Sequence, residues 1–377
     1  MAGTSAVDSA IAQPASAARP YAPSWFDRLI DLIEQLPGPA WPYYLLAWLV
    51  PVVVIVLVKW ADGTYSPPFI NPFHVVLASN IAYLLAVVPF LDRAARRALT
   101  TFRPASTLTE EQATDVEYRL TTMPARPALI WSLILLVIGL LWSGTMTIVV
   151  YKVPEVDYAM SLLLRSLSLF TSPLSDVVDG VVMLASFTLA GVLIYHTYHQ
   201  LSVVDDLYRR HAHINLFYLR PLYAFSRLTV FTSIVLLAQS YVLPASIPDF
   251  LTNPVASFSM RISLVVQISI VAIVVFVAPL IGIHHLLVEE KEKLLAASAK
   301  RIEDAIAQFD SHLDSGELKD MSLMKDTMEG LATRQKFIDD IPTWPWSTET
   351  SRLLITAITL PIVLYVIQRV IELLLVR

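Results

Sequence analysis

Residues 262–288 read ISLVVQISIVAIVVFVAPLIGIHHLLV, and this stretch contains no Asp, Glu, Lys or Arg. A helix that crosses a bilayer needs about 20 mostly apolar residues, because each residue rises about 1.5 Å and the hydrocarbon layer is about 30 Å thick. The stretch meets this requirement by itself. It predicts a transmembrane helix, and the same two criteria, length and absence of charge, can be applied to the rest of the chain.

Six more spans are expected on the same grounds. Five further stretches lack the four charged residue types and are long enough to cross a bilayer: 41–58, 63–91, 127–151, 180–204 and 228–248. The last span is expected within 348–377, where Arg352 and Arg369 flank an apolar run and can extend toward opposite interfaces. The sequence therefore predicts an all-α, polytopic membrane protein with about seven transmembrane helices.

One apolar segment inside the six-span bundle of residues 41–285 is interpreted differently. Residues 154–175 carry Asp157 near their start and Arg165 at their middle. A charge at the bilayer centre is costly, so we expect an interfacial or re-entrant segment there.

Composition supports a membrane protein and excludes several other classes. Of 377 residues, 55% are hydrophobic and 16% are charged, where soluble domains carry about 25% charged residues. The chain has no cysteine, which excludes disulfides and thiolate metal sites. Its ten glycines form neither a GxxxxGK[ST] nor a GxGxxG motif, which argues against ATP and dinucleotide binding. So few glycines also argue against close helix contacts of the GxxxG type.

The distribution of basic residues predicts the orientation. Most of the 27 Lys and Arg residues fall in the N-terminal segment, the loops after the second and fourth spans, and the long segment before the last span. Cytoplasmic loops carry the excess of Lys and Arg. We expect insertion in the plasma (cell inner) membrane with the N-terminus cytoplasmic and the C-terminus outside. The net charge of −5 gives no indication of nucleic-acid binding.

Two elements are expected before the first span. Residues 1–23 are rich in Ala, Ser and Pro and are expected to form a disordered tail. Residues 24–36 predict an amphipathic helix at the inner interface, with Ser24 as its N-cap. Its apolar face is formed by Trp25, Phe26, Leu29, Ile30, Ile33 and Leu36.

Residues 286–347 predict a cytoplasmic helical hairpin. The sixth span continues without a helix breaker into a long polar helix, which ends near Asp314-Ser315-Gly316. Apolar residues of the second helix recur every three or four positions, a coiled-coil spacing: Met321, Met324, Met328, Leu331 and Ile338. This face can contact a neighbouring subunit in a homo-oligomer, or it can cover the first helix of the same chain.

Histidines gather near the inner end of the fourth span, at His196, His199, His211 and His213. Imidazole binds metal ions and titrates near neutral pH. The spacing matches no strong metal signature, so a metal site, a pH-sensitive interface and ordinary interfacial histidines are all compatible with it.

The last helix has one polar and β-branched face. At 100° per residue this face contains Thr348, Arg352, Thr356, Thr359, Val363, Val366 and Val370. A pore-lining helix with a hydrophobic constriction would have this pattern. An ordinary surface that faces lipid or another helix would also accommodate it.

Catalytic chemistry is absent from the expected spans. They show no Ser/His/Asp set, no paired carboxylates, no buried lysine and no acid–histidine relay, and Asp176 and Asp179 are explained as first-turn helix residues. An enzyme is the least supported class, and no cofactor is indicated.

The order of parts resembles the insect odorant and gustatory receptor-like channels. The resemblance covers the chain from Trp41 onward and rests on topology: seven spans, a cytoplasmic N-terminus, a sixth span prolonged into a cytoplasmic helical region, and a final span at the C-terminus. In that family the last helix lines a tetrameric pore and the cytoplasmic helices hold the subunits together. The resemblance would assign these roles to residues 348–370 and 286–340.

The leading hypothesis is therefore an oligomeric ion channel gated by a ligand or another stimulus, whose ligand the sequence does not identify. The alternative is a non-conducting membrane sensor or scaffold whose hairpin recruits a partner. A transporter is less well supported, since no matching pair of interrupted helices suggests an inverted repeat.

Overall fold

The computed structural model describes residues 20–152, 172–246, 254–315 and 321–375, and all regular elements within these ranges are helices. Five described segments are long and apolar enough to cross a membrane: Trp41–Ala61, Pro72–Ala105, Ala125–Thr145, Pro173–His211 and Val265–Asp314. Over the described residues the protein is thus all-helical and multi-pass in character, with five such segments where the sequence predicts seven. The expected tail through residue 19 and most of the expected re-entrant segment lie outside the described ranges.

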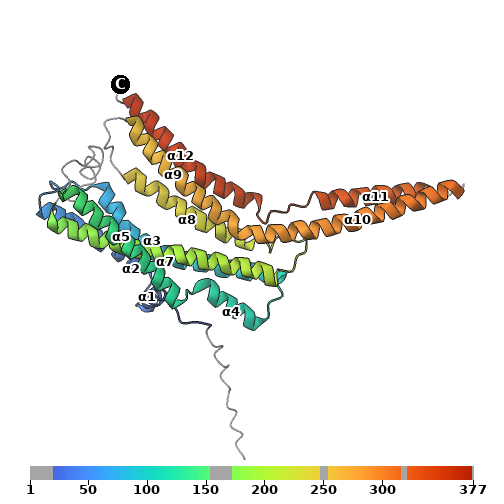
Figure 1. Ribbon diagram of the computed structural model, residues 1–377, viewed down its shortest axis with the longest axis horizontal. Helices are drawn as coiled ribbons and strands as arrows, with labels where there is room; N and C mark the ends of the chain where they lie inside the picture. The colour runs from blue at the N-terminus through green and yellow to red at the C-terminus, as the bar shows by residue number, and fades with distance from the viewer. Residues whose placement is uncertain (1–19, 153–171, 247–253, 316–320, 376–377) are drawn as a thin grey trace, which may run out of the picture.

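The long helices form two groups (Figure 1). The first group contains α2 (Trp41–Ala61), α3 (Pro72–Phe102), α5 (Ala125–Lys152) and α7 (Pro173–His211). The second contains α8 (Ala224–Ser246), α9 (Pro254–Val277) and α12 (Thr348–Leu375). Helices α3 and α7 contribute side chains to all three apolar cores of the described structure, so the remaining helices pack around this pair.

Glycine brings α5 and α7 unusually close together. A Cβ atom built on Gly191 of α7 would lie 2.5 Å from the carbonyl oxygen of Trp131 in α5. A Cβ atom on Gly139 of α5 would lie 3.0 Å from the Phe187 ring. So few glycines argued against close helix contacts of the GxxxG type, but single glycines on the two helices, Gly139 and Gly191, are enough for a close approach here.

Helix α1 (Trp25–Gln35) confirms the predicted amphipathic helix and its N-cap. The Ser24 hydroxyl accepts a hydrogen bond from the Asp27 backbone N–H, and the Asp27 carboxylate accepts one from the Ser24 N–H. Phe26 and Ile30 are buried in a core shared with α3, α5 and α7. The apolar face thus packs on the protein itself. The end of the expected disordered tail is in contact with the bundle, because the Tyr21 hydroxyl donates to the carbonyl of Thr122.

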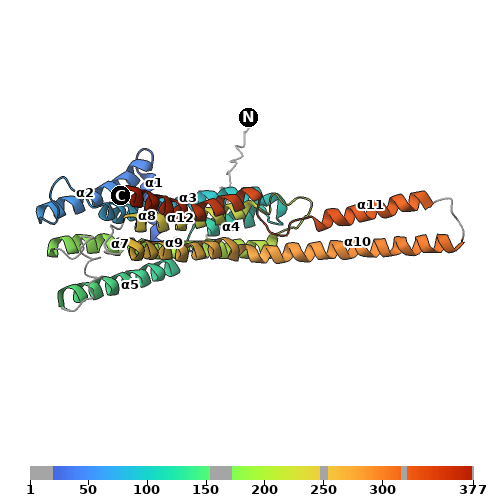
Figure 2. The same cartoon turned by 90° about the horizontal axis from the view of Figure 1, so that it is seen from above.

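Helix α9 continues through a single 3-10 turn, η2 (Ala278–Leu280), into α10 (Ile281–Ser315). Pro279 lies in this turn, where its missing N–H interrupts the α-helical hydrogen bonding. Helix α11 (Met321–Asp339) lies beside α10, and both extend well beyond the other helices (Figures 1 and 2). We call this extension the arm.

The coiled-coil face of α11 points mainly to α10 of the same chain. Ile338 is buried and Met324, Met328 and Leu331 are half-buried, although the other α11 residues around them are mostly exposed. The side chain of Met321 lies outside the described part of the structure. The face predicted for contact between subunits therefore has a partner within the chain, and no second copy is needed to cover it.

Candidate functional site

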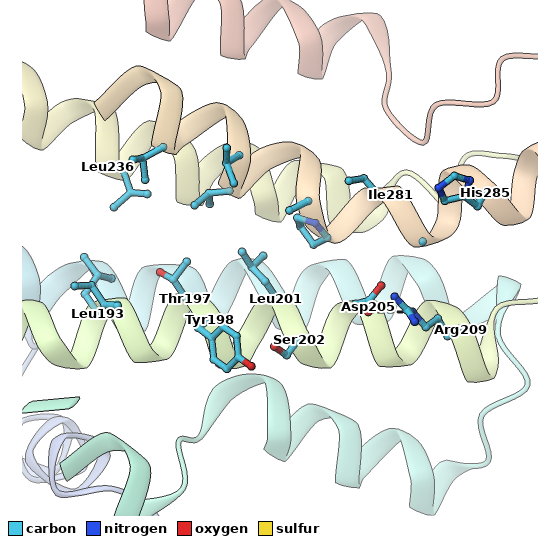
Figure 3. Close-up of a pocket in the computed structure, with 17 residues that line it drawn as sticks. Leu193, Thr197, Tyr198, Leu201, Ser202, Asp205, Arg209, Leu236, Ile281 and His285 are labelled. Atoms are coloured by element: carbon cyan, nitrogen blue, oxygen red, sulfur yellow. Dashed lines mark ion pairs between the residues drawn. The ribbon is translucent and has the colours of Figure 1, made fainter. Parts of the chain in front are cut away.

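A long groove runs between α7 and the continuous segment formed by α9, η2 and α10 (Figure 3). Its volume is about 600 Å³, within the range of small-molecule sites. Leu193, Thr197 and Leu201 project from α7 toward α9, and Leu236 comes from α8. The opposite wall is apolar and contains Val271, Val274, Val275 and Ala278. The groove is therefore largely hydrophobic along its length.

One end of the groove is polar. Asp205 and Arg209, one turn apart on α7, form an ion pair with 3.0 Å between Oδ2 and Nε, and His285 of α10 lies across from them. Helix α10 comes close here because residue 282 is glycine, where a Cβ atom would lie 2.7 Å from Asp205 Oδ1. We call Asp205, Arg209 and His285 the groove mouth.

The groove wall also contains a polar atom without a partner. Thr197 is 8% exposed, and its hydroxyl makes no hydrogen bond to any described residue. Ser186 and Thr188 of the same helix instead donate to carbonyl oxygens one turn earlier. A buried hydroxyl without a partner costs free energy. The hydroxyl oxygen has almost no accessible surface although the side chain lines the groove, so it would reach a bound molecule only after rotation about χ1.

An aromatic stack connects α10 to the segment before α12. The Trp344 ring stacks on His284 with 3.9 Å between centroids, and on Trp346 with 4.5 Å. Trp346 in turn contacts Phe276 of α9 at 5.2 Å. We call these four rings the aromatic joint. The sequence does not predict this contact, because the two tryptophans and His284 lie far apart in the chain.

Backbone contacts reinforce the same junction. The Lys291 ammonium of α10 donates to the carbonyl oxygens of Asp339 and Ile341, at 2.5 Å and 3.1 Å. His284 Nδ1 lies 3.1 Å from the carbonyl oxygen of Thr343. The start of α12 is thus held against α10. His285 is adjacent to His284 and faces the groove, so the groove mouth and the aromatic joint are neighbours on one helix.

The predicted pore-lining face of α12 points away from the chain's own helices. Leu354 is buried, and Ala357 and Ile358 pack against the core that includes α8 and α9. All seven predicted residues are exposed: Thr348, Arg352, Thr356, Thr359, Val363, Val366 and Val370. This face is available to lipid or to another subunit.

A buried charged cluster joins α2, α3 and α7. Lys59 Nζ lies 2.8 Å from Asp179 Oδ2, and the two side chains are 1% and 7% exposed. His74 Nε2 lies 3.3 Å from the same oxygen, and the Tyr65 hydroxyl lies 2.6 Å from His74 Nδ1. A neutral His74 with its proton on Nε2 satisfies both contacts. We call these four residues the Lys59 cluster.

The Lys59 cluster corrects two expectations. The prediction that no span contains a buried lysine is wrong, since Lys59 lies in the last turn of α2. The explanation of Asp179 as a simple first-turn residue is incomplete, because its carboxylate pairs with Lys59. The apolar stretch that ends at Lys59 gives little indication that its partner is Asp179, because the two residues are far apart in sequence.

A second carboxylate–histidine pair lies between α3 and α7. His196 Nε2 is 2.9 Å from Asp92 Oδ1, and His196 is almost fully buried. Asp92 also lines a polar cavity of about 360 Å³ between α1 and α3. The sequence did not indicate this contact, because Asp92 and His196 lie on different helices and 104 positions apart.

The four histidines singled out by sequence do not come together. His196 pairs with Asp92, whereas His199 Nε2 lies 3.1 Å from the Tyr21 hydroxyl. The backbone groups of His211 and His213 bond to residues 105–107. Within the described ranges, no group of three or more His, Cys, Asp or Glu residues could hold a metal ion.

Three groups outside the membrane-spanning segments have shifted pKa values. Burial raises the pKa of the Tyr21 hydroxyl well above its usual range. Burial also raises the pKa of Asp27, although hydrogen bonds from Ser24 and Met123 act in the opposite direction. Burial likewise acts to raise the pKa of Asp62, but hydrogen bonds from Ser172, Ser175 and Thr64 outweigh it and hold this pKa below its usual range.

Comparison of the chain with known protein families, with curated proteins and with solved structures gave no match. Function must therefore be argued from the groove, the aromatic joint and the exposed face of α12.

Proposed function

We propose that the protein is an oligomeric, ligand-gated ion channel with seven transmembrane helices, in which α12 lines the pore. Helices α8 and α12 would complete seven crossings with the five apolar segments. The distribution of basic residues supports a cytoplasmic N-terminus and an outside C-terminus. The arm, α10 with α11, would then form a cytoplasmic hairpin.

The observation that carries this proposal is the orientation of α12. Leu354, Ala357 and Ile358 pack on the neighbouring helices. Thr356, Thr359 and Arg352 lie on the exposed side, together with apolar residues such as Leu353 and Ile355, whereas Thr350 is buried. Polar side chains in a membrane helix usually face the protein interior or a water-filled cavity. Around a symmetry axis, copies of this face would form a pore with threonines toward the cytoplasm and a constriction of valines toward the outside.

The aromatic joint supplies a route from ligand to pore. A molecule in the groove would contact residues of α10 near His285, and the adjacent His284 stacks on Trp344 just before α12. A shift of α10 would therefore move the base of the pore helix directly.

A cysteine-accessibility experiment tests this function. The chain has no cysteine, so Val363→Cys and Leu364→Cys each introduce one thiol. Both positions are exposed, at 49% and 36%, but they point about 100° apart on the helix. In liposomes, a charged water-soluble thiol reagent should block ion flux through Val363→Cys and spare Leu364→Cys. Absence of flux in the unsubstituted protein, or a strictly monomeric particle, would contradict the proposal.

A second candidate function is a non-conducting sensor or scaffold. Phe217 and Phe337 are 74% and 69% exposed, and both line a surface groove between the α7–α8 connection and α11. Exposed aromatic residues of this kind are typical of protein contacts. Purification of the full chain with a stoichiometric partner that Phe337→Ser releases, together with absence of ion flux, would favour this function.

A further inference from the structure

The groove between α7 and α9 combines three features that together restrict its occupant. It is apolar over most of its length, it ends in charged groups at the groove mouth, and its wall contains the unpartnered Thr197 hydroxyl. From Leu193 to Arg209 the groove follows α7 for about 24 Å, at about 1.5 Å per residue. A long, narrow molecule with one polar end matches this shape.

The groove mouth favours an anionic end group. Arg209 pairs with Asp205 through its Nε, and its guanidinium has no second ion-pair partner among the described residues. A guanidinium presents five donors in a planar fork that suits carboxylate and phosphate oxygens. His285 lies across the mouth as a further donor. Asp205 holds Arg209 in position. Its negative charge also disfavours a ligand that carries a second carboxylate farther along its chain.

Thr197 adds a requirement at a fixed distance from the mouth. It lies two helical turns before Asp205, about 12 Å along the axis. Its hydroxyl is buried and makes no hydrogen bond among the described residues, and its side chain lines the groove, so rotation about χ1 would turn the hydroxyl toward a bound molecule. A ligand with a hydroxyl or carbonyl partway along its chain would satisfy this group, and a plain hydrocarbon would leave it unsatisfied.

We propose that the groove binds an anionic amphiphile, a long-chain carboxylate or phosphate monoester, and prefers one with a polar group partway along its chain. The charged end lies at Arg209 and His285, the polar group lies at Thr197, and the apolar remainder fills the space beside Val271 and Val274. This site would supply the ligand of the channel, and only that regulatory role rests on the proposed function. Binding itself does not depend on it.

Binding can be measured with the full-length protein in nanodiscs of a zwitterionic phospholipid. The probe is cis-parinaric acid, a fluorescent fatty acid. Its competitors are stearate, stearate with a mid-chain hydroxyl, lysophosphatidic acid and neutral octadecanol. We expect stearate and lysophosphatidic acid to displace the probe and octadecanol to compete poorly. The relative strength of the first two distinguishes a carboxylate from a phosphate end group.

Matched variants locate the site. Arg209→Gln should weaken binding of both acids by about tenfold, whereas Arg210→Gln, the adjacent arginine that pairs with Asp206 and does not line the groove, should not. Val274→Trp should fill the groove and abolish binding, whereas Ile273→Trp, exposed on another face of α9, should leave it intact. The hydroxylated stearate should bind about three- to tenfold more tightly than stearate, and Thr197→Val should remove that difference.

Several results would overturn the proposal. Equal binding by Arg209→Gln and Arg210→Gln, or strong competition by octadecanol, would exclude an anionic site. Equal affinity for the two stearates would exclude the role of Thr197. Loss of an oligomer in Val274→Trp, with no probe binding to the unsubstituted protein, would identify the groove as a contact between copies. Probe binding without ion flux would contradict the channel proposal but support the ligand site. Ion flux without probe binding would support the channel but contradict the ligand site.

Discussion

The His284 and Trp344 rings lie parallel, with 7° between their planes, although 59 residues separate His284 from the Thr343 carbonyl that its Nδ1 also contacts. This pairing fixes α10 to the start of α12. Any movement at the base of the arm must therefore be shared with α12 or must break the stack.

Removal of the Trp344 ring should weaken this connection. Trp344→Ala is expected to lower the thermal midpoint in detergent and to increase protease cleavage between α11 and α12, because stacked aromatic pairs contribute about 0.5–1.5 kcal/mol beyond their buried area. Trp344→Phe should retain part of the effect. Trp142→Ala removes an exposed tryptophan of α5 and serves as the control. Equal cleavage of the two alanine variants would contradict a structural role of the joint.

The Lys59–Asp179 pair should show strong coupling. Lys59→Met or Asp179→Leu alone leaves one buried charge without its ion-pair partner, so each is expected to reduce the free energy of unfolding by about 3–5 kcal/mol. The double variant removes both charges and should cost much less than the sum. Denaturation in mixed micelles measures the four proteins of the cycle. Lys293→Met, at an exposed ion pair on α10, should have no measurable effect, and additive losses at Lys59 and Asp179 would contradict the coupling.

The contact between α5 and α7 should not tolerate a methyl group. Gly191→Ala would place Cβ against the Trp131 carbonyl, and we expect a loss of about 1–3 kcal/mol from the resulting displacement. Gly144→Ala, at a helical glycine with open space around it, should be neutral or stabilise by up to about 1 kcal/mol. Thermal unfolding of both variants measures the contrast. Similar midpoints would show that the helices separate without cost.

The stability of the α1 region should depend on pH through Asp27. Burial raises the pKa of its folded carboxyl above the unfolded value of 3.8. Folding therefore favours the protonated form, and this contribution is largest below the unfolded pKa and is lost as pH rises through the folded pKa. Asp27→Asn keeps an acceptor for the Ser24 and Met123 N–H groups and removes the charge.

Asp27→Asn should consequently be at least as stable as the unsubstituted protein near neutral pH and should show a smaller change in stability on acidification. Asp27→Ala, which leaves both N–H groups without their acceptor, should lose about 1–3 kcal/mol. Unfolding curves from about pH 4 to pH 7 distinguish the three proteins. A larger acid dependence in the Asn variant would contradict the sign of the effect.

The parts of the fold that follow local rules could be predicted from sequence. The charge-free stretches within α3 and α7 and the Ser24 cap of α1 each depend on neighbouring residues only. The C-terminal ends of the helices were harder to predict, because α3 and α7 continue past their charge-free stretches to Phe102 and His211. There the charged residues are solvated or paired, as in the Arg210–Asp206 contact.

The candidate site was largely hidden because its residues meet only after folding. Thr197 and Val274 look like ordinary apolar-helix residues until α7 and α9 are placed side by side. Lys59 looks like a residue that marks the end of a span, and its carboxylate partner lies 120 residues away. The polar and β-branched face of α12 follows from the periodicity of a single helix, but its exposure depends on how α12 packs against α8 and α9.

The arm also acts as a mechanical amplifier. Helix α10 is 35 residues long, so its tip lies about 52 Å from its base, at about 1.5 Å per residue. A tilt of about 10° at Pro279 would carry the tip through about 9 Å, while Gly282, three residues from the pivot, would move by less than about 1 Å. A fluorophore at the tip would thus report sub-ångström adjustments at the base as displacements large enough for distance measurements by energy transfer.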